Sequence, residues 1–314
     1  MDAFKHVLAA IDFSSGSTSA LALAADMAEA SDAELTLLHV HALGFTVDLP
    51  ATGASLEGES RTRILRALEK LAHPWRDRVG GVNVVVREGD PATEIAAFAE
   101  AHRVDLVALG THGRRGIDRL ILGSVAEHVS RLVHCSVLAV HQPPSEGALP
   151  SSGGLRSILC PLDLSEASEG TLRRALTLAE TTRAKVTVMH AVDAWHWEDP
   201  WPMARVDDGE ARRRLFQSAH ERLSRLLVAS RGAVRVETVI TFGRPASEIL
   251  RVSRLCRADA IVLGAHSRSG MDRFFFGSTA QTVLRGGAGA ILLVRAPIVR
   301  HNGAVETERG HVEV

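Results

Sequence analysis

Two glycine-rich stretches carry residue types and spacings that could hold a phosphate group. The first, GTHGRRGIDRLILGS, runs from Gly110 to Ser124, and the second, GAHSRSGMDRFFFGS, runs from Gly264 to Ser278. In each, a glycine follows an apolar run typical of a strand, and a Gly-Ser pair precedes a helical pattern. Glycine lets a ligand approach the backbone, and free N–H groups at a helix start favour phosphate. The pattern predicts phosphate binding near Ser124, with Arg114 adding charge-assisted hydrogen bonds.

The same residues also allow an interpretation without a ligand. Gly110 and Gly113 would then only form tight turns, and Ser124 would only cap the helix that follows. A single short glycine motif would not separate the two interpretations. Two long copies, each after a strand and before a helix, favour phosphate binding.

The elements that must position these stretches occur twice in the 314 residues. Each copy opens with a short apolar strand that ends in an acid, Asp12 or Asp163. Asp163 follows Asp12 by 151 residues, and Gly264 follows Gly110 by 154. The near-constant offset indicates two copies of one unit.

Strand–helix alternation with near-continuous apolar strands predicts a parallel sheet that is covered by helices on both faces. Ligands of such sheets lie beyond the carboxyl ends of the strands. Asp12 and Gly110 both follow strands, so their loops should face one crevice if the first and fourth strands are neighbours.

Composition divides the chain into four segments. We predict a first domain over residues 1–143, a linker rich in Pro, Gly and Ser over 144–154, a second domain over 155–297 and a flexible tail over 298–314. The last strands of the two copies, SVLAV and AILLV, are both apolar. They predict that the domains pack together through these strands in a pseudo-two-fold arrangement.

The pattern Gly110-x-x-Gly113, nine residues, then Gly123-Ser124 resembles the nucleotide-binding signature of the universal stress protein family. The opening AAIDFS, the EGDP turn and the final CSVLAV also fit, so the resemblance covers nearly the whole chain as two tandem domains. It implies, in each domain, an open five-stranded parallel α/β sheet of the Rossmann-like (adenine nucleotide alpha hydrolase-like) type, with strand order 3-2-1-4-5. It further implies binding of ATP or another adenine nucleotide, Mg²⁺ or Mn²⁺ at the phosphates, and pairing of chains as homodimers.

The resemblance also assigns contacts by position. Asp12 should meet the ribose or adenine, and Val40 should offer backbone groups to the adenine. Without a ligand, Asp12 would instead only cap the helix that follows it. The first-domain set is Ala10, Ile11, Asp12, Val40, Gly110, His112, Gly113, Arg114, Gly123, Ser124 and Val125. The second-domain counterparts are Pro161, Leu162, Asp163, Ala191, Gly264, Ser267, Arg268, Gly277, Ser278 and Thr279.

The second copy departs from the signature at one glycine. Ser267 stands where the first copy has Gly113. If that position needs a positive φ, serine costs about 1 kcal/mol or more, and its side chain enters the phosphate path. We therefore expect the first domain to bind nucleotide more reliably than the second, where binding is left open and should be weaker.

Other features restrict the classes of function. The net charge of −1 argues against nucleic-acid binding. No apolar run is long enough to span a bilayer, so no membrane association is expected.

Cys135, Cys160 and Cys256 are widely separated and odd in number, which fits a reducing cytoplasm rather than a disulfide framework. His39 and His41 form an H-x-H pattern, but without a third ligand we interpret them as strand-end histidines and predict no protein metal site.

Three functions remain open. The leading hypothesis is a cytoplasmic ATP-binding regulatory or stress-response module with a protein partner that the sequence does not identify. A second is an interaction or dimerisation module with vestigial sites, which the tryptophan-rich loop at Trp195–Trp201 and Ser267 would suit. A third is slow ATP hydrolysis or self-phosphorylation at Ser124, although no catalytic set and no lysine of the Walker type is present.

Overall fold

The computed structural model describes residues 4–41, 55–111, 123–141, 155–193, 209–229, 234–265 and 277–295. The predicted linker, the predicted tail and the Trp195–Trp201 loop lie outside these residues. None of the described helices is long and apolar enough to cross a membrane.

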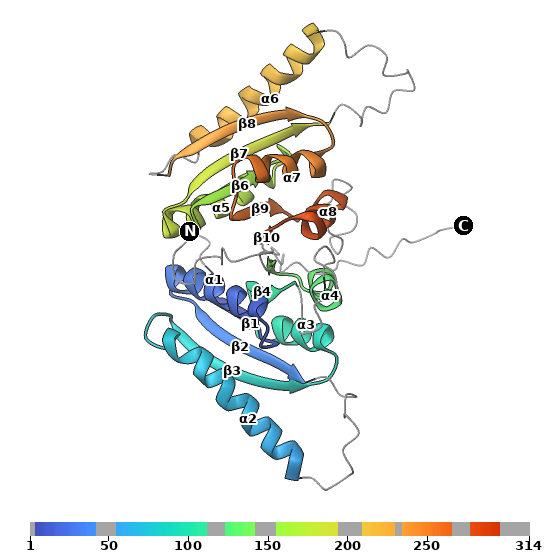
Figure 1. Cartoon of the computed structure of the whole chain (residues 1–314). Helices are drawn as coiled ribbons and strands as arrows, with labels where there is room; N and C mark the ends of the chain where they lie inside the picture. Colours follow the sequence, from blue (N-terminus) through green and yellow to red (C-terminus); the bar gives the residue numbers. More distant parts are fainter. Residues whose placement is uncertain are drawn as a thin grey trace, which may run out of the picture.

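The first half of the chain alternates strands and helices (Figure 1). Its elements are β1 (His6–Ala10), α1 (Ser15–Ser31), β2 (Glu34–His41), α2 (Ser55–Ala72), a short 3-10 helix η1 (His73–Trp75), β3 (Gly81–Glu88), α3 (Pro91–Ala101), β4 (Leu106–Gly110), α4 (Ser124–Leu132) and β5 (Ser136–Val140).

The second half repeats this order. Its elements are β6 (Ser157–Pro161), α5 (Ser168–Thr182), β7 (Lys185–Val192), α6 (Gly209–Ala229), β8 (Val236–Phe242), α7 (Pro245–Leu255), β9 (Ala260–Gly264), α8 (Ser278–Gly286) and β10 (Ala290–Val294).

Each half forms the sheet that the resemblance implied. The strand order is β3-β2-β1-β4-β5 in the first half and β8-β7-β6-β9-β10 in the second, with parallel pairing within each half. Buried residues form two clusters, one under α1, α2, α5 and α6 and the other under α3, α4, α7 and α8, so helices cover both faces. The predicted fold class and strand order are confirmed.

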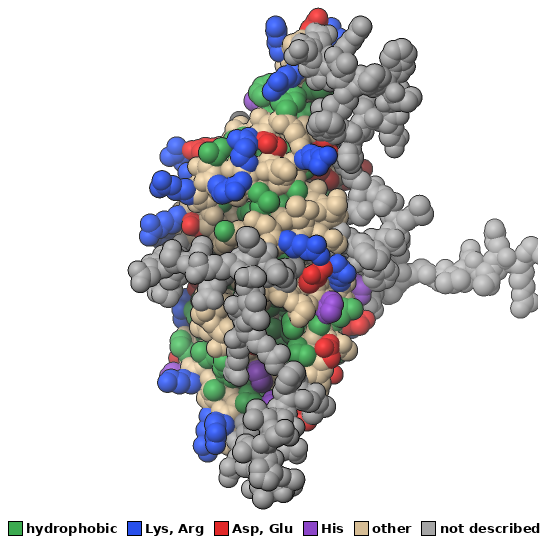
Figure 2. Space-filling view, turned by 45° about the vertical axis from the view of Figure 1, so that its right-hand side comes forward, with side chains coloured by type: hydrophobic (Ala, Val, Ile, Leu, Met, Phe, Trp, Pro, Cys, Tyr) green, Lys and Arg blue, Asp and Glu red, His purple; other side chains and the backbone are tan. Residues whose placement is uncertain are grey.

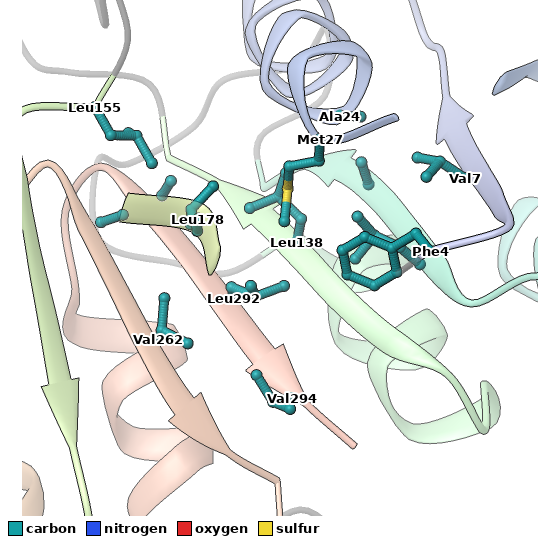
Figure 3. Packing of buried hydrophobic residues seen from close by; sticks show 14 of the residues in the cluster. Phe4, Val7, Ala24, Met27, Leu138, Leu155, Leu178, Val262, Leu292 and Val294 are labelled. Atoms are coloured by element: carbon teal, nitrogen blue, oxygen red, sulfur yellow. The ribbon is translucent and has the colours of Figure 1, made fainter. Parts of the chain in front are cut away.

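The two halves join through their last strands. β5 and β10 pair antiparallel, with Leu138 opposite Leu292, so the halves form one ten-stranded sheet. Both strands are buried along their whole length. Figure 3 shows Leu138 and Leu292 beside Met27 of α1 and Leu178 of α5. This confirms the prediction that the copies pack through their final strands.

Charged side chains also connect the halves, beside the start of α4. Glu127, in the first turn of α4, accepts hydrogen bonds from Arg131 at 2.7 Å and from Arg285 of α8 at 2.6 Å. Arg295 donates from Nη2 to the carbonyl oxygen of Ser130 at 3.1 Å. Helices α4 and α8 are thus held together across the domain boundary.

The three cysteines are free, and burial suppresses their ionisation. Burial raises the pKa of the Cys135 thiol to about 12 and raises the pKa of the Cys160 thiol further. The pKa of Cys256, which is less buried, is also raised by burial. Because the thiolate is the reactive form, we expect Cys135 and Cys160 to resist an aromatic disulfide reagent at about pH 8 until the protein unfolds. A thiol titration of native and urea-unfolded chain checks this, and rapid reaction of all three thiols in the native protein would contradict it.

Candidate functional site

The end of β4 approaches the start of α1 at the carboxyl edge of the first half-sheet. β1 and β4 are neighbours, as the common crevice required. A Cβ atom on Gly110, at the end of β4, would lie 2.7 Å from both the carbonyl carbon of Gly16 and the backbone nitrogen of Ser17. Only glycine lets the end of β4 approach the start of α1 this closely.

Asp12 and Asp163, which follow the first strand of each copy, form hydrogen bonds within the loop that comes after that strand. The Oδ1 atom of Asp12 accepts a hydrogen bond from the backbone N–H of Ser14 at 2.9 Å. Ser14, rather than Asp12, is the N-cap of α1, because its hydroxyl accepts from Ser17 N at 3.1 Å. The interpretation of Asp12 as the helix cap is therefore wrong, and its carboxylate acts on the loop.

Asp163 repeats this role with more hydrogen bonds. Its Oδ1 atom accepts from the backbone N–H and the hydroxyl of Ser165, at 3.0 and 2.6 Å, and from the hydroxyl of Ser168 at 2.9 Å. Asp163 lies two residues beyond the end of β6.

The histidines near the ends of β2 and β7, His39 and His190, form hydrogen bonds to the same loops. The Nδ1–H of His39 donates to the carbonyl oxygen of Ile11 at 2.6 Å, and that of His190 donates to Leu162 at 2.8 Å. In the part of the chain that the structure describes, no three His, Cys, Asp or Glu side chains gather as a metal site. The interpretation of His39 as a strand-end histidine agrees with its contact.

Glycine also sets the starts of α4 and α8. Gly123 and Gly277 are the N-caps, and neither helix receives a side-chain cap hydrogen bond. The N–H of Gly123 donates to the carbonyl oxygen of Thr111 at 2.7 Å, and a Cβ on Gly123 would lie 2.5 Å from that oxygen. Ser124 is the first helical residue and is exposed, so the interpretation of Ser124 as the cap is wrong.

A cavity of about 770 Å³ opens at the corresponding edge of the second half-sheet. Its apolar lining includes Met189, Ile249 and Leu263, and its polar lining includes His190 and Arg244. Eight of the predicted second-domain residues line it: Pro161, Leu162, Asp163, Ala191, Gly264, Gly277, Ser278 and Thr279. The cavity thus brings together residues from three separate stretches of the sequence.

Five of the predicted residues lie outside the described residues: His112, Gly113, Arg114, Ser267 and Arg268. Of the first-domain set, Ala10, Ile11, Asp12 and Val40 follow or end β1 and β2, and Gly110, Gly123, Ser124 and Val125 lie where β4 ends and α4 begins. These positions share the carboxyl edge of the first half-sheet.

Sequence reasoning did not assign several residues of the second-domain cavity, among them Asp193, Arg244 and Thr282. A signal for Arg244 was present, since the turn FGRP aligns with EGDP in the first copy and differs from it in charge. Thr282 lies on α8 behind the glycine stretch, and the motif gave no reason to include it.

Two parallel α/β half-sheets, joined in tandem and each with a glycine-capped helix at its carboxyl edge, define a tandem protein of the Rossmann-like class. The profile of the universal stress protein family matches residues 3–141 and again residues 154–295. The chain therefore belongs to the universal stress protein family, as two tandem family domains.

Known relatives agree with this assignment. A universal stress protein of Methanocaldococcus jannaschii is 35% identical over 148 residues, which are 46% of this chain and 85% of the relative. A universal stress protein structure from Archaeoglobus fulgidus aligns with a TM-score of 0.61 at 20% identity, over 93% of this chain and 97% of its own. A putative universal stress protein from Pseudomonas aeruginosa aligns with a TM-score of 0.65 at 18% identity, over 93% and 94%. The two structures support the tandem fold.

Proposed function

We propose that this chain is an adenine-nucleotide-binding universal stress protein, with ATP as the ligand and a regulatory role in the stress response. The nucleotide occupies the crevice at the carboxyl edge of each half-sheet. Binding stabilises the domain in proportion to the ratio of ligand concentration to Kd, and partners can sense that change.

One observation carries the proposal: the second-domain cavity is lined by the residues that the family signature marks in that domain. Its volume of about 770 Å³ falls within the range of small-molecule sites. The signature is a feature of the sequence, and the cavity is a feature of the fold. Their agreement favours a ligand over glycines that only form turns.

The lining supplies a suitable group for each part of a nucleotide. Met189, Ile249 and Leu263 offer apolar surface to a base. Asp163 offers carboxylate oxygens to sugar hydroxyls, which donate hydrogen bonds. The start of α8 at Ser278 offers backbone N–H groups and the positive end of the helix dipole to phosphate.

A divalent cation would fit here only together with the phosphates. The described residues contain no cluster of three metal-binding side chains, so they offer no complete site by themselves. Mg²⁺ keeps several waters and is commonly held through one or two carboxylates and substrate phosphates. Among the described residues that line the cavity, Asp163 and Asp193 are the carboxylates that could take part.

Replacing the first residue of α4 or of α8 with aspartate should weaken nucleotide binding at one site, in the domain that carries the substitution. Ser124→Asp and Ser278→Asp place a carboxylate where the phosphate binds, while an acid at a helix start leaves the helix intact. We expect isothermal titration with Mg–ATP to show two sites per chain in the wild type, and each variant to weaken one of them by about tenfold or more.

The control for these variants is Gln217→Glu, which adds the same charge at an exposed position of α6 and should bind as the wild type does. A folded wild-type chain that binds no adenine nucleotide at millimolar concentration would contradict the proposal. That outcome would favour an interaction module whose sites are vestigial.

A further inference from the structure

Arg244 lines the second-domain cavity from the turn between β8 and α7, and the matching turn of the first domain carries Asp90. The two turns, FGRP and EGDP, each precede a helix that begins with proline, Pro245 or Pro91. The charge at the same place in the fold is therefore reversed. At this turn the two domains therefore carry opposite charges.

Two helices begin at the second-domain cavity without a side-chain cap. Arg244 is the N-cap of α7 and Gly277 is the N-cap of α8, and neither gives a side-chain hydrogen bond to its helix. The first residues of both helices, Pro245 and Ser278, line the cavity. Uncapped N–H groups and two helix dipoles then act together with a guanidinium, and all of them favour an anion.

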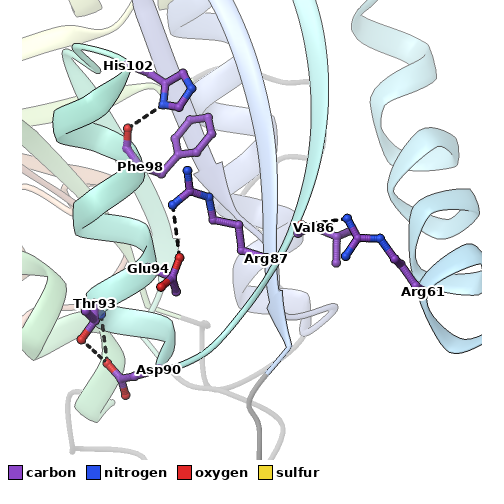
Figure 4. Close-up of polar contacts among 8 residues, drawn as sticks. All are labelled: Arg61, Val86, Arg87, Asp90, Thr93, Glu94, Phe98 and His102. Carbon is purple, nitrogen blue, oxygen red and sulfur yellow. Dashed lines mark hydrogen bonds and ion pairs between the residues drawn. The ribbon is translucent and has the colours of Figure 1, made fainter. Parts of the chain in front are cut away.

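In the first domain, Asp90 itself caps the helix. Its Oδ2 atom accepts hydrogen bonds from the backbone N–H of Thr93 at 2.9 Å and from its hydroxyl at 2.8 Å (Figure 4). These hydrogen bonds, together with the charge of the nearby His128, hold the pKa of Asp90 below its usual range. Asp90 is a carboxylate near neutral pH, so it offsets the positive end of α3 and repels a second anion.

The charge at this turn acts close to the start of the following helix. His128 lies in the second turn of α4 and is near enough to Asp90 to affect its pKa. The counterpart of His128 on α8 is Thr282, which lines the same cavity as Arg244. In each domain the turn therefore lies near the second turn of the glycine-capped helix.

We infer that Arg244 lets the second-domain cavity bind ATP without a divalent cation, whereas Asp90 makes ATP binding by the first domain depend on Mg²⁺. The inference rests on the proposed function. The guanidinium balances phosphate charge in the second domain, while in the first Mg²⁺ lowers the ligand charge that Asp90 repels. Without metal, the second domain is then the stronger binder, which reverses the expectation drawn from Ser267.

Isothermal titration of the full chain with ATP, first in a chelator and then in Mg²⁺, tests this inference. We expect the wild type to bind one ATP in chelator and a second when Mg²⁺ is added. Arg244→Asp, which copies the charge of the first domain, should weaken the metal-free site by about tenfold or more. Asp90→Asn keeps a capping side chain and removes the charge, so a second metal-free site should appear.

Arg254→Asp is the matched control, because it makes the same change of charge in the last turn of α7, away from the cavity lining. Metal-free affinity of Arg244→Asp within about twofold of the Arg254→Asp control would overturn the inference while leaving nucleotide binding intact. A folded wild type that binds no ATP in chelator or in Mg²⁺ would overturn the proposed function as well.

Discussion

A chain with Leu292→Ala is expected to lose about 2–5 kcal/mol of unfolding free energy, and Leu292→Asp should not fold into the joined sheet at all. Leu292 is 1% exposed in β10 and lies opposite Leu138 of β5. Its side chain packs where both halves contribute to one core, so a cavity there weakens both. Urea unfolding, followed by circular dichroism, measures the change.

The control for this prediction is a leucine of the same size on the surface. Leu255, at the end of α7, is 70% exposed, so Leu255→Ala should change the unfolding free energy by less than about 0.5 kcal/mol. If Leu292→Ala were as mild as Leu255→Ala, the β5–β10 join would not contribute to the stability of the chain.

The sheet could be predicted from sequence because the signals are local and occur twice. Each strand is an apolar run that ends at a recognisable residue, such as Asp12 or Gly110, and the constant offset fixes the correspondence of the copies. SVLAV and AILLV are apolar strands that are buried on both sides, so each has few possible pairing partners other than the other. Periodicity and repetition were sufficient for these features.

The helix caps could not be predicted to the residue. Sequence placed the cap of α1 at Asp12 and that of α4 at Ser124, as alternatives to ligand binding, and the structure places the caps at Ser14 and Gly123. A shift of one or two residues depends on which backbone N–H a side chain reaches, and sequence patterns rarely settle this.

Sequence reasoning missed the proposed role of Arg244 for a different reason, although the aligned turns FGRP and EGDP already differ in charge. Arg244 and the glycine-capped helix line one cavity because α7 packs beside α8 over the same face of the sheet. The overall charge gives no sign of the difference at this turn. The net charge of the chain is −1, and Figure 2 shows basic and acidic side chains interspersed on the surface. The reversal of charge becomes visible when the corresponding turns of the two domains are compared.

Gly123→Val is expected to abolish nucleotide binding by the first domain and to lower the unfolding free energy by about 1–3 kcal/mol. A Cβ at this position would lie 2.5 Å from the carbonyl oxygen of Thr111. Because that oxygen belongs to the backbone, a change of side-chain rotamer cannot relieve the clash. The start of α4 would have to move away from the end of β4, and the hydrogen bond from Gly123 N to that oxygen would be lost. The N–H groups proposed to hold phosphate would move with it.

The control is Gly81→Val, because a Cβ on Gly81 of β3 meets nothing within 4 Å and a β-branched residue suits a strand. ATP titration should show one site lost in Gly123→Val and none lost in Gly81→Val. The site that remains in Gly123→Val should be the one that binds without Mg²⁺, because the second-domain cavity is unaltered. Two sites of wild-type affinity in Gly123→Val would mean that the glycine-capped start of α4 is a turn and not a phosphate site.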